Sequence, residues 1–200
     1  MKRTQSGFTL IELALVGLFL SLLTIFVISQ FSESATDNVK GKGLFEAANK
    51  ITENWALLSM QCGTPIDIGV SPIGDATTPT AAENLTVILG GANPIAAYTA
   101  CYGRSGIKPL FGLAQGAAGG ESINGYAVTA AMDGTNPRRL VISFAGVPDN
   151  VLLPIYNRYS SVAGAAAATT VPAAADTTDP QIRFSVAASG VRTVSIVKAL

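Results

Sequence analysis

Apolar residues fill the start of the chain almost without interruption. Between residues 8 and 31, Glu12 is the only charged side chain. About 24 residues in helical conformation extend roughly 36 Å, which is long enough to cross a bilayer. A carboxylate at bilayer depth costs several kcal/mol and is usually functional. The pattern therefore predicts a hydrophobic transmembrane or assembly helix over residues 8–31 and requires an explanation for Glu12.

A periodic pattern replaces this run after residue 31, and it predicts the amphipathic half of one long helix over residues 32–60. Its apolar positions recur at spacings of four and three, which defines one helix face. We expect this face to pack on a sheet, with a seam to a partner helix as the alternative. Gly41 and Gly43 each destabilise a helix interior by roughly 1 kcal/mol, so a bend or fraying is expected between residues 36 and 43. The apolar face comprises Leu44, Ala48, Ile51, Trp55 and Leu58, and the polar positions are Glu46, Asn49, Lys50, Glu53 and Asn54.

From residue 61 to residue 200 the pattern is that of short strands separated by turn-forming residues. Two pairs of strands flank Asp133–Gly134 and Ser189–Gly190, which are typical hairpin turns. The last strand has one clearly apolar face, around Val194 and Ile196, and is predicted to be an edge strand. The predicted strands are Thr86–Leu89, Tyr98–Tyr102, Tyr126–Met132, Leu140–Phe144, Ile182–Ala188 and Val191–Val197.

Three segments, 63–84, 111–121 and 160–180, are rich in small or turn-forming residues and are predicted to be loops. A short helix is expected near Ala81, and a helical turn after Asp149. The apolar residues of that turn either cover the core or form a subunit contact; they are Leu152, Leu153, Ile155 and Tyr156. The predicted fold class is α+β, with one long N-terminal helix packed on the antiparallel sheet of a globular β-rich part, residues 61–200.

Composition argues against catalysis and against nucleic-acid binding. The chain has no histidine, and its two cysteines alone cannot form a four-ligand zinc site. Its 13 basic residues are scattered and balanced by 13 acidic ones, so no basic face for nucleic acid is expected. The aspartates stand apart, mostly in turns, and neither "DATTPTAAE" nor "DTTD" has the spacing of a known calcium loop. We therefore expect no enzymatic activity, no metal and no cofactor. The sequon at Asn84–Thr86 is a three-residue match that arises often by chance.

The N-terminus allows three interpretations. Lys2 and Arg3 followed by an apolar run suit a secretory signal peptide, but the run is long, contains Glu12 and lacks a good small-residue cleavage site. A plain transmembrane anchor with the basic end in the cytoplasm is the second interpretation. The third is proteolytic processing, because "KRTQSGFTLIE" resembles the leader of the type IV prepilins. This family includes type IV pilins and the pseudopilins of type II secretion.

The resemblance implies a sequence of processing steps at named residues. A prepilin peptidase removes the leader, residues 1–7, by cutting between Gly7 and Phe8, and Phe8 is then N-methylated. Glu12 becomes the fifth mature residue, one helical turn from the new amine and on the same face. There it can neutralise the amine of its own or of a neighbouring subunit, which sets the register of assembly. Mere tolerance of Glu12 at a membrane edge is the alternative.

The resemblance also implies the protein's function, partners and location. It predicts a structural subunit of a pilus (fimbrium) that polymerises with copies of itself, driven by an inner-membrane assembly platform and an ATPase. The precursor is expected in the inner membrane as a single-pass protein, and the mature subunit in an extracellular filament for adhesion, motility or secretion. Many major pilins carry a proline near the end of the apolar segment, but none precedes Pro65 here. A minor pilin, a pseudopilin or a non-polymerising anchored binding module therefore remain alternatives.

The predicted orientation places both cysteines on the far side of the membrane. That compartment is oxidising in bacteria, so a Cys62–Cys101 disulfide is expected. It would stabilise the fold by roughly 3–4 kcal/mol on the chain-entropy model and tether the helix end to the globular part. Many pilins instead enclose a C-terminal loop with their disulfide, so this central position departs from the family pattern.

Overall fold

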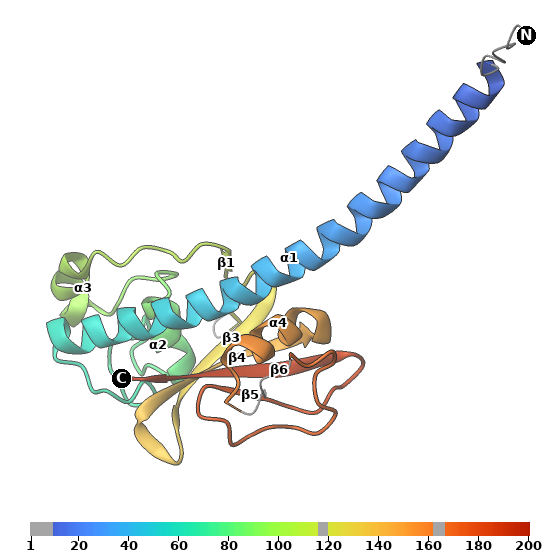
Figure 1. Ribbon diagram of the computed structural model, residues 1–200. Coiled ribbons are helices and arrows are strands. Elements are labelled where there is room, and N and C mark those ends of the chain that lie inside the picture. The colour runs from blue at the N-terminus through green and yellow to red at the C-terminus, as the bar shows by residue number, and fades with distance from the viewer. Residues whose placement is uncertain (1–9, 116–119, 162–166) are drawn as a thin grey trace, which may run out of the picture. The chain divides into compact units, whose positions relative to one another are not determined.

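The computed structural model describes residues 10–115, 120–161 and 167–200, although not the side chains of residues 10, 13 and 26–34. The chain divides into two units, Met1–Asp37 and Asn38–Leu200. We refer to them as the N-terminal and the C-terminal unit and describe each by itself. The C-terminal unit contains the sheet and all helices except the first part of α1 (Figure 1).

Helix α1, Leu10–Cys62, is continuous through residues 36–43. The bend or fraying predicted there from Gly41 and Gly43 is therefore wrong. Gly41 instead allows close approach to α4, Asp149–Tyr159, because a Cβ at this position would lie 2.9 Å from Ile155 Cγ1 and from the Val151 carbonyl oxygen. Among the described residues, no helix carries a segment both long and apolar enough to span a membrane.

The predicted apolar face of α1 is confirmed in the C-terminal unit. All five of its side chains are completely buried: Leu44, Ala48, Ile51, Trp55 and Leu58. Asn54, predicted on the polar face, is also buried, and its Nδ2 donates a hydrogen bond to the Ile88 carbonyl oxygen at 3.0 Å. That bond satisfies the amide, which would otherwise be costly to bury.

The described strands form one antiparallel sheet of six, in the order β1-β2-β3-β4-β6-β5. This confirms the α+β class with an antiparallel sheet. Both predicted hairpins form, β3 with β4 and β5 with β6, and Ser189 and Gly190 both take positive φ in the second turn, as tight hairpin turns require. The strands are β1 Leu113–Ala114, β2 Ser122–Ile123, β3 Tyr126–Asp133, β4 Asn136–Pro148, β5 Ile182–Phe184 and β6 Val191–Ala199.

Strand β6 is not at the edge of the sheet, contrary to the prediction, because it pairs with β4 on one side and β5 on the other. Its apolar face is confirmed, since Val194 and Ile196 are completely buried. Strand β5 is shorter than predicted and ends at Phe184. Its outer edge is covered by Asp176, which exchanges two backbone hydrogen bonds with Phe184. Such covering prevents edge-to-edge aggregation.

Two other predicted strands are helical. Residues 86–88 belong to α2, Ala81–Ile88, and residues 98–102 to the 3-10 helix η1, Ala96–Tyr98, and to α3, Thr99–Ser105. Helix α2 begins with a capping box: Thr80 accepts from the Glu83 backbone N–H, and Glu83 accepts from the Thr80 backbone N–H. This pair of bonds favours a helix over the strand suggested by the branched residues that follow.

The remaining predictions for this unit hold in part. Helix α4 extends the helical turn predicted after Asp149, with Leu152, Ile155 and Tyr156 buried in the core. Segment 63–80 is irregular, as expected. The loops 111–121 and 160–180 include residues 116–119 and 162–166, which lie outside the described residues. Of the rest, Glu121 and Asp179 are buried, so these loops are not wholly surface structures.

Candidate functional site

The predicted processing site lies outside the described residues, because Gly7 and Phe8 fall within residues 1–9. Glu12 is described and is an exposed residue in the first turn of α1. A carboxylate in this position interacts favourably with the partial positive charge of the helix N-terminus.

Beyond Glu12, the N-terminal unit presents large apolar side chains that remain exposed. Two of its hydroxyl side chains bond within the helix: Ser21 Oγ donates to the Gly17 and Leu18 carbonyl oxygens at 3.0 and 2.9 Å, and Thr24 Oγ1 donates to the Leu20 carbonyl oxygen at 2.7 Å. These hydroxyls therefore do not interrupt the apolar surface. We define the apolar helix surface as Ile11, Leu15, Val16, Leu18, Phe19, Leu20, Leu22, Leu23 and Ile25, each at least half exposed.

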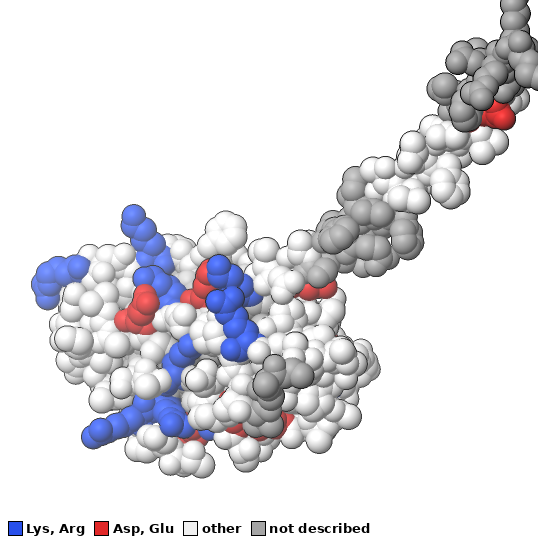
Figure 2. Space-filling model, in the orientation of Figure 1, with Lys and Arg blue, Asp and Glu red and all other residues white. Residues whose placement is uncertain are grey.

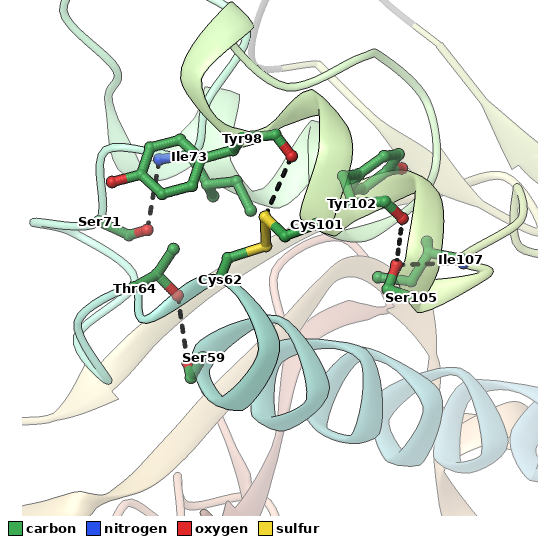
Figure 3. Close-up of a disulfide and its surroundings, with 10 residues drawn as sticks. All are labelled: Ser59, Cys62, Thr64, Ser71, Ile73, Tyr98, Cys101, Tyr102, Ser105 and Ile107. Carbon is green, nitrogen blue, oxygen red and sulfur yellow. Dashed lines mark hydrogen bonds between the residues drawn. A yellow bond between two sulfur atoms is a disulfide. The ribbon is translucent and has the colours of Figure 1, made fainter.

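The C-terminal unit holds its part of α1 by specific contacts at the helix end. Trp55 Nε1 donates to the Ile66 carbonyl oxygen at 2.6 Å. The predicted disulfide is confirmed: Cys62, the last residue of α1, is bonded to Cys101 of α3 (Figure 3). The next residue, Gly63, takes a positive φ of 65°, the usual way to end a helix. The disulfide thus ties the helix end to a segment 39 residues away in sequence.

Aromatic rings and a lysine join α1 to two other elements. Phe45 of α1 stacks on Tyr159 of α4 with ring centroids 3.7 Å apart. Lys198 of β6 places its Nζ 3.5 Å from the Phe45 centroid, within the range of a cation–π interaction. Burial lowers the pKa of Lys198 below its usual value. This arrangement is suited to holding the helix on the sheet.

Two ion pairs with buried members join distant elements, one between strands β3 and β5 and one between β6 and α4. Arg183 donates to Asp133 at 2.9 Å, and this bond, together with one from the Thr135 backbone, lowers the pKa of Asp133 to about 2. Arg192, buried in β6, donates to Asp149 of α4 at 2.6 Å. Asp133 and Asp149 are therefore not isolated turn residues, contrary to the prediction. The sequence held no signal for these pairs, because their members lie 50 and 43 residues apart.

The two carboxylates of "DTTD", Asp176 and Asp179, accept hydrogen bonds from nearby backbone N–H groups. Burial of Asp179 would raise the pKa of its carboxyl group. The carboxylate accepts hydrogen bonds from the backbone of Ile182 and Gln181 and from the side chains of Ser161 and Ser160, and these bonds outweigh burial, so the pKa is lowered. Asp176 accepts from the N–H groups of Thr178 and Asp179. Within the described residues, no group of three or more acidic, histidine or cysteine side chains is arranged to hold a metal ion.

The sequon residue Asn84 is completely buried and its side chain is fully used. Its amide donates to the Ile68 and Ser71 carbonyl oxygens at 2.6 and 2.8 Å and accepts from the Gly74 N–H at 2.7 Å. Asn84 therefore organises the irregular 63–80 segment and is not available for glycosylation in the folded chain.

Compared with models of known protein families, with curated proteins and with solved structures, the chain shows no match.

Proposed function

We propose that this protein is a structural subunit of a type IV pilus-type filament that polymerises through its N-terminal helix. The observation that carries the proposal is the exposed apolar helix surface on α1, together with the acidic Glu12 in the first turn of the same helix. Contiguous apolar surface of this kind marks a membrane or protein contact. The compact, disulfide-linked C-terminal unit supplies the part of a subunit that folds independently of that contact.

In this proposal the sequence around Gly7 specifies the chemistry of assembly. Cleavage after Gly7 leaves an amine on Phe8 with an ordinary pKa near 8, hence a positive charge at neutral pH. The helix dipole disfavours this charge, and a carboxylate one turn along compensates it. Glu12 of one subunit then pairs with the amine of the next and sets the register between them. This part rests on the sequence, because residues 1–9 are not described.

The proposed partners are copies of this chain, a prepilin peptidase and an ATPase-driven assembly platform in the inner membrane. Residues 8–31 would hold the precursor in that membrane, with the C-terminal unit in the periplasm, before extrusion into an extracellular filament. The lack of a proline before Pro65 favours a minor pilin or a pseudopilin as the second candidate. An anchored binding module that never polymerises is the third.

Mass spectrometry of the mature N-terminus separates processing from simple anchoring. A chain beginning at Phe8, free or methylated, is expected in the native host, whereas Gly7→Ala should retain residues 1–7. A leader that is retained in the wild type, or removed from Gly7→Ala at the usual rate, would refute the processing step.

Glu12→Val tests the proposed register. The variant should remain in the membrane fraction but yield at least tenfold less sheared fibre, because the amine has lost its counter-ion. Glu46→Val is the matched control, since Glu46 is also an exposed α1 carboxylate and pairs with Lys42 at the surface. Equal fibre yields from both variants would contradict the role assigned to Glu12.

A further inference from the structure

Charge is distributed unevenly along the C-terminal unit. Between residues 54 and 103 the chain carries Asp67, Asp75 and Glu83 but no lysine or arginine. Residues 104–111 reverse this, with Arg104 and Lys108 and no carboxylate. Two segments of opposite charge therefore adjoin the two ends of the disulfide, one after Cys62 and one after Cys101.

Exposed apolar side chains accompany both charged segments. Ile66 and Val70 are 58% and 66% exposed beside Asp67, and Phe111 is 96% exposed beyond Lys108. We define the acidic surface as the exposed side chains Ile66, Asp67 and Val70, which lie within five residues of one another, and the basic surface as Arg104, Lys108 and Phe111. Phe111 and Lys108 line a groove of about 370 Å³ against α1.

Among the described residues, no ion pair neutralises the charges of the two surfaces. In the part of the chain that the structure describes, the ion pairs involve other residues, and none joins Asp67 to Arg104 or Lys108. In Figure 3, Thr64 and Ser71, which flank Asp67 in the sequence, lie on one side of the disulfide, and Ser105 and Ile107, which lie between Arg104 and Lys108 in the sequence, lie on the other. Figure 2 shows both basic and acidic side chains exposed on the visible face of the C-terminal unit.

We infer that the acidic surface of one subunit binds the basic surface of the next copy. The inference rests on the proposed function and specifies a second contact, between C-terminal units. Opposite charges select the partner and its orientation, and Ile66, Val70 and Phe111 bury apolar area between them. Two different surfaces of one chain make a heterologous contact, which repeats head to tail and generates an open helical assembly. The disulfide fixes the spacing of the two surfaces within each subunit.

Charge reversal in the full-length chain tests the contact. Lys108→Glu and Asp67→Lys are each expected to reduce sheared-fibre yield at least threefold, and the chain carrying both should recover to within twofold of wild type. Arg138→Glu is the control, because Arg138 is an exposed cation outside both surfaces. Wild-type yield from either single variant, or no recovery in the double variant, would overturn the contact.

Cysteine cross-linking tests directly whether the acidic surface of one subunit lies against the basic surface of the next. A chain with Ile66→Cys and Phe111→Cys should give a ladder of disulfide-linked multimers from purified fibres, whereas Val186→Cys with Phe111→Cys should not; Val186 is 59% exposed but belongs to neither surface. Fibres visible by electron microscopy without a ladder would refute this contact while leaving the filament function intact. A wild-type chain that forms no fibres in its native host would refute both.

Discussion

The two parts of helix α1 place their large apolar side chains in opposite surroundings. In the N-terminal unit, Phe19 is 64% exposed, whereas in the C-terminal unit Trp55 is completely buried. The same contrast separates Leu18, 63% exposed, from Leu58, which is buried. Apolar area buried within the chain stabilises its fold by roughly 25 cal/mol per Å², and area left exposed provides that free energy only when something else covers it. The second part of α1 therefore contributes apolar burial to the fold, whereas the apolar side chains described in the first part stay exposed.

The polar residues of the two parts differ in the same way. Ser21 and Thr24 bond to carbonyls of their own helix. Asn54 bonds to Ile88, which lies 34 residues away in sequence. Local satisfaction leaves a helix independent of any particular partner, whereas long-range bonds commit it to one tertiary structure. The comparison thus predicts that equivalent substitutions in the two parts have different effects.

Replacing one aromatic residue in each part of α1 by alanine should show the largest difference between the two parts. Trp55→Ala removes a buried ring and its hydrogen bond to Ile66, and is expected to lower the free energy of unfolding by about 3–5 kcal/mol. Phe19→Ala should change it by less than about 0.5 kcal/mol but reduce fibre yield. Guanidinium denaturation followed by circular dichroism, together with shearing assays, measures both. Similar destabilisation by the two variants would show that the N-terminal unit is also packed within the chain.

A glycine pair sharpens the comparison at the level of close packing. Gly41→Ala places a Cβ against Ile155 and the Val151 carbonyl, so a net loss of about 1–2 kcal/mol is expected despite the better helix propensity of alanine. Gly17 has no atom within 4 Å of such a Cβ, and Gly17→Ala should be neutral or stabilising. Thermal unfolding of the two variants measures the difference. Equal melting temperatures would mean that α4 yields to the added methyl group.

An effect no larger than that of Gly41→Ala is expected from charge and pH. The pKa of Asp133 is about 2 in the fold against an ordinary 3.8, so its ionised form stabilises the fold above about pH 4, and this stabilisation disappears as the pH falls through 2. Asp133→Asn should lower the free energy of unfolding by about 1–2 kcal/mol at pH 7 and remove that acid dependence.

Glu46→Gln is the matched control for Asp133→Asn, because its pair with Lys42 is exposed and contributes about 0–1 kcal/mol. Denaturation at pH 2, 4 and 7 distinguishes the two variants. An unchanged pH profile in Asp133→Asn would show that the Asp133–Arg183 pair does not stabilise the fold.

Periodic patterns in the sequence were sufficient for a large part of the fold. The face from Leu44 to Leu58, the β3–β4 and β5–β6 hairpins and the Cys62–Cys101 disulfide follow from spacing, turn chemistry and the expected compartment. Local signals failed at residues 86–88 and 98–102, where branched and aromatic residues suggested strands but the chain is helical. At residues 86–88, the capping box of α2 and the burial of Val87 and Ile88 outweigh intrinsic β propensity.

The features discussed for the candidate site also divide into those that the sequence alone identifies and those that only the tertiary structure shows. Gly7, Phe8, Glu12 and the apolar run of residues 8–31 can be identified from sequence alone, because a linear motif and a continuous hydrophobic stretch need no tertiary contact to be recognised. Only the tertiary structure decided that Gly41 accommodates α4, that Asn84 is buried, and that Asp133 pairs with Arg183. These depend on which distant segments meet, and packing of the whole chain determines that.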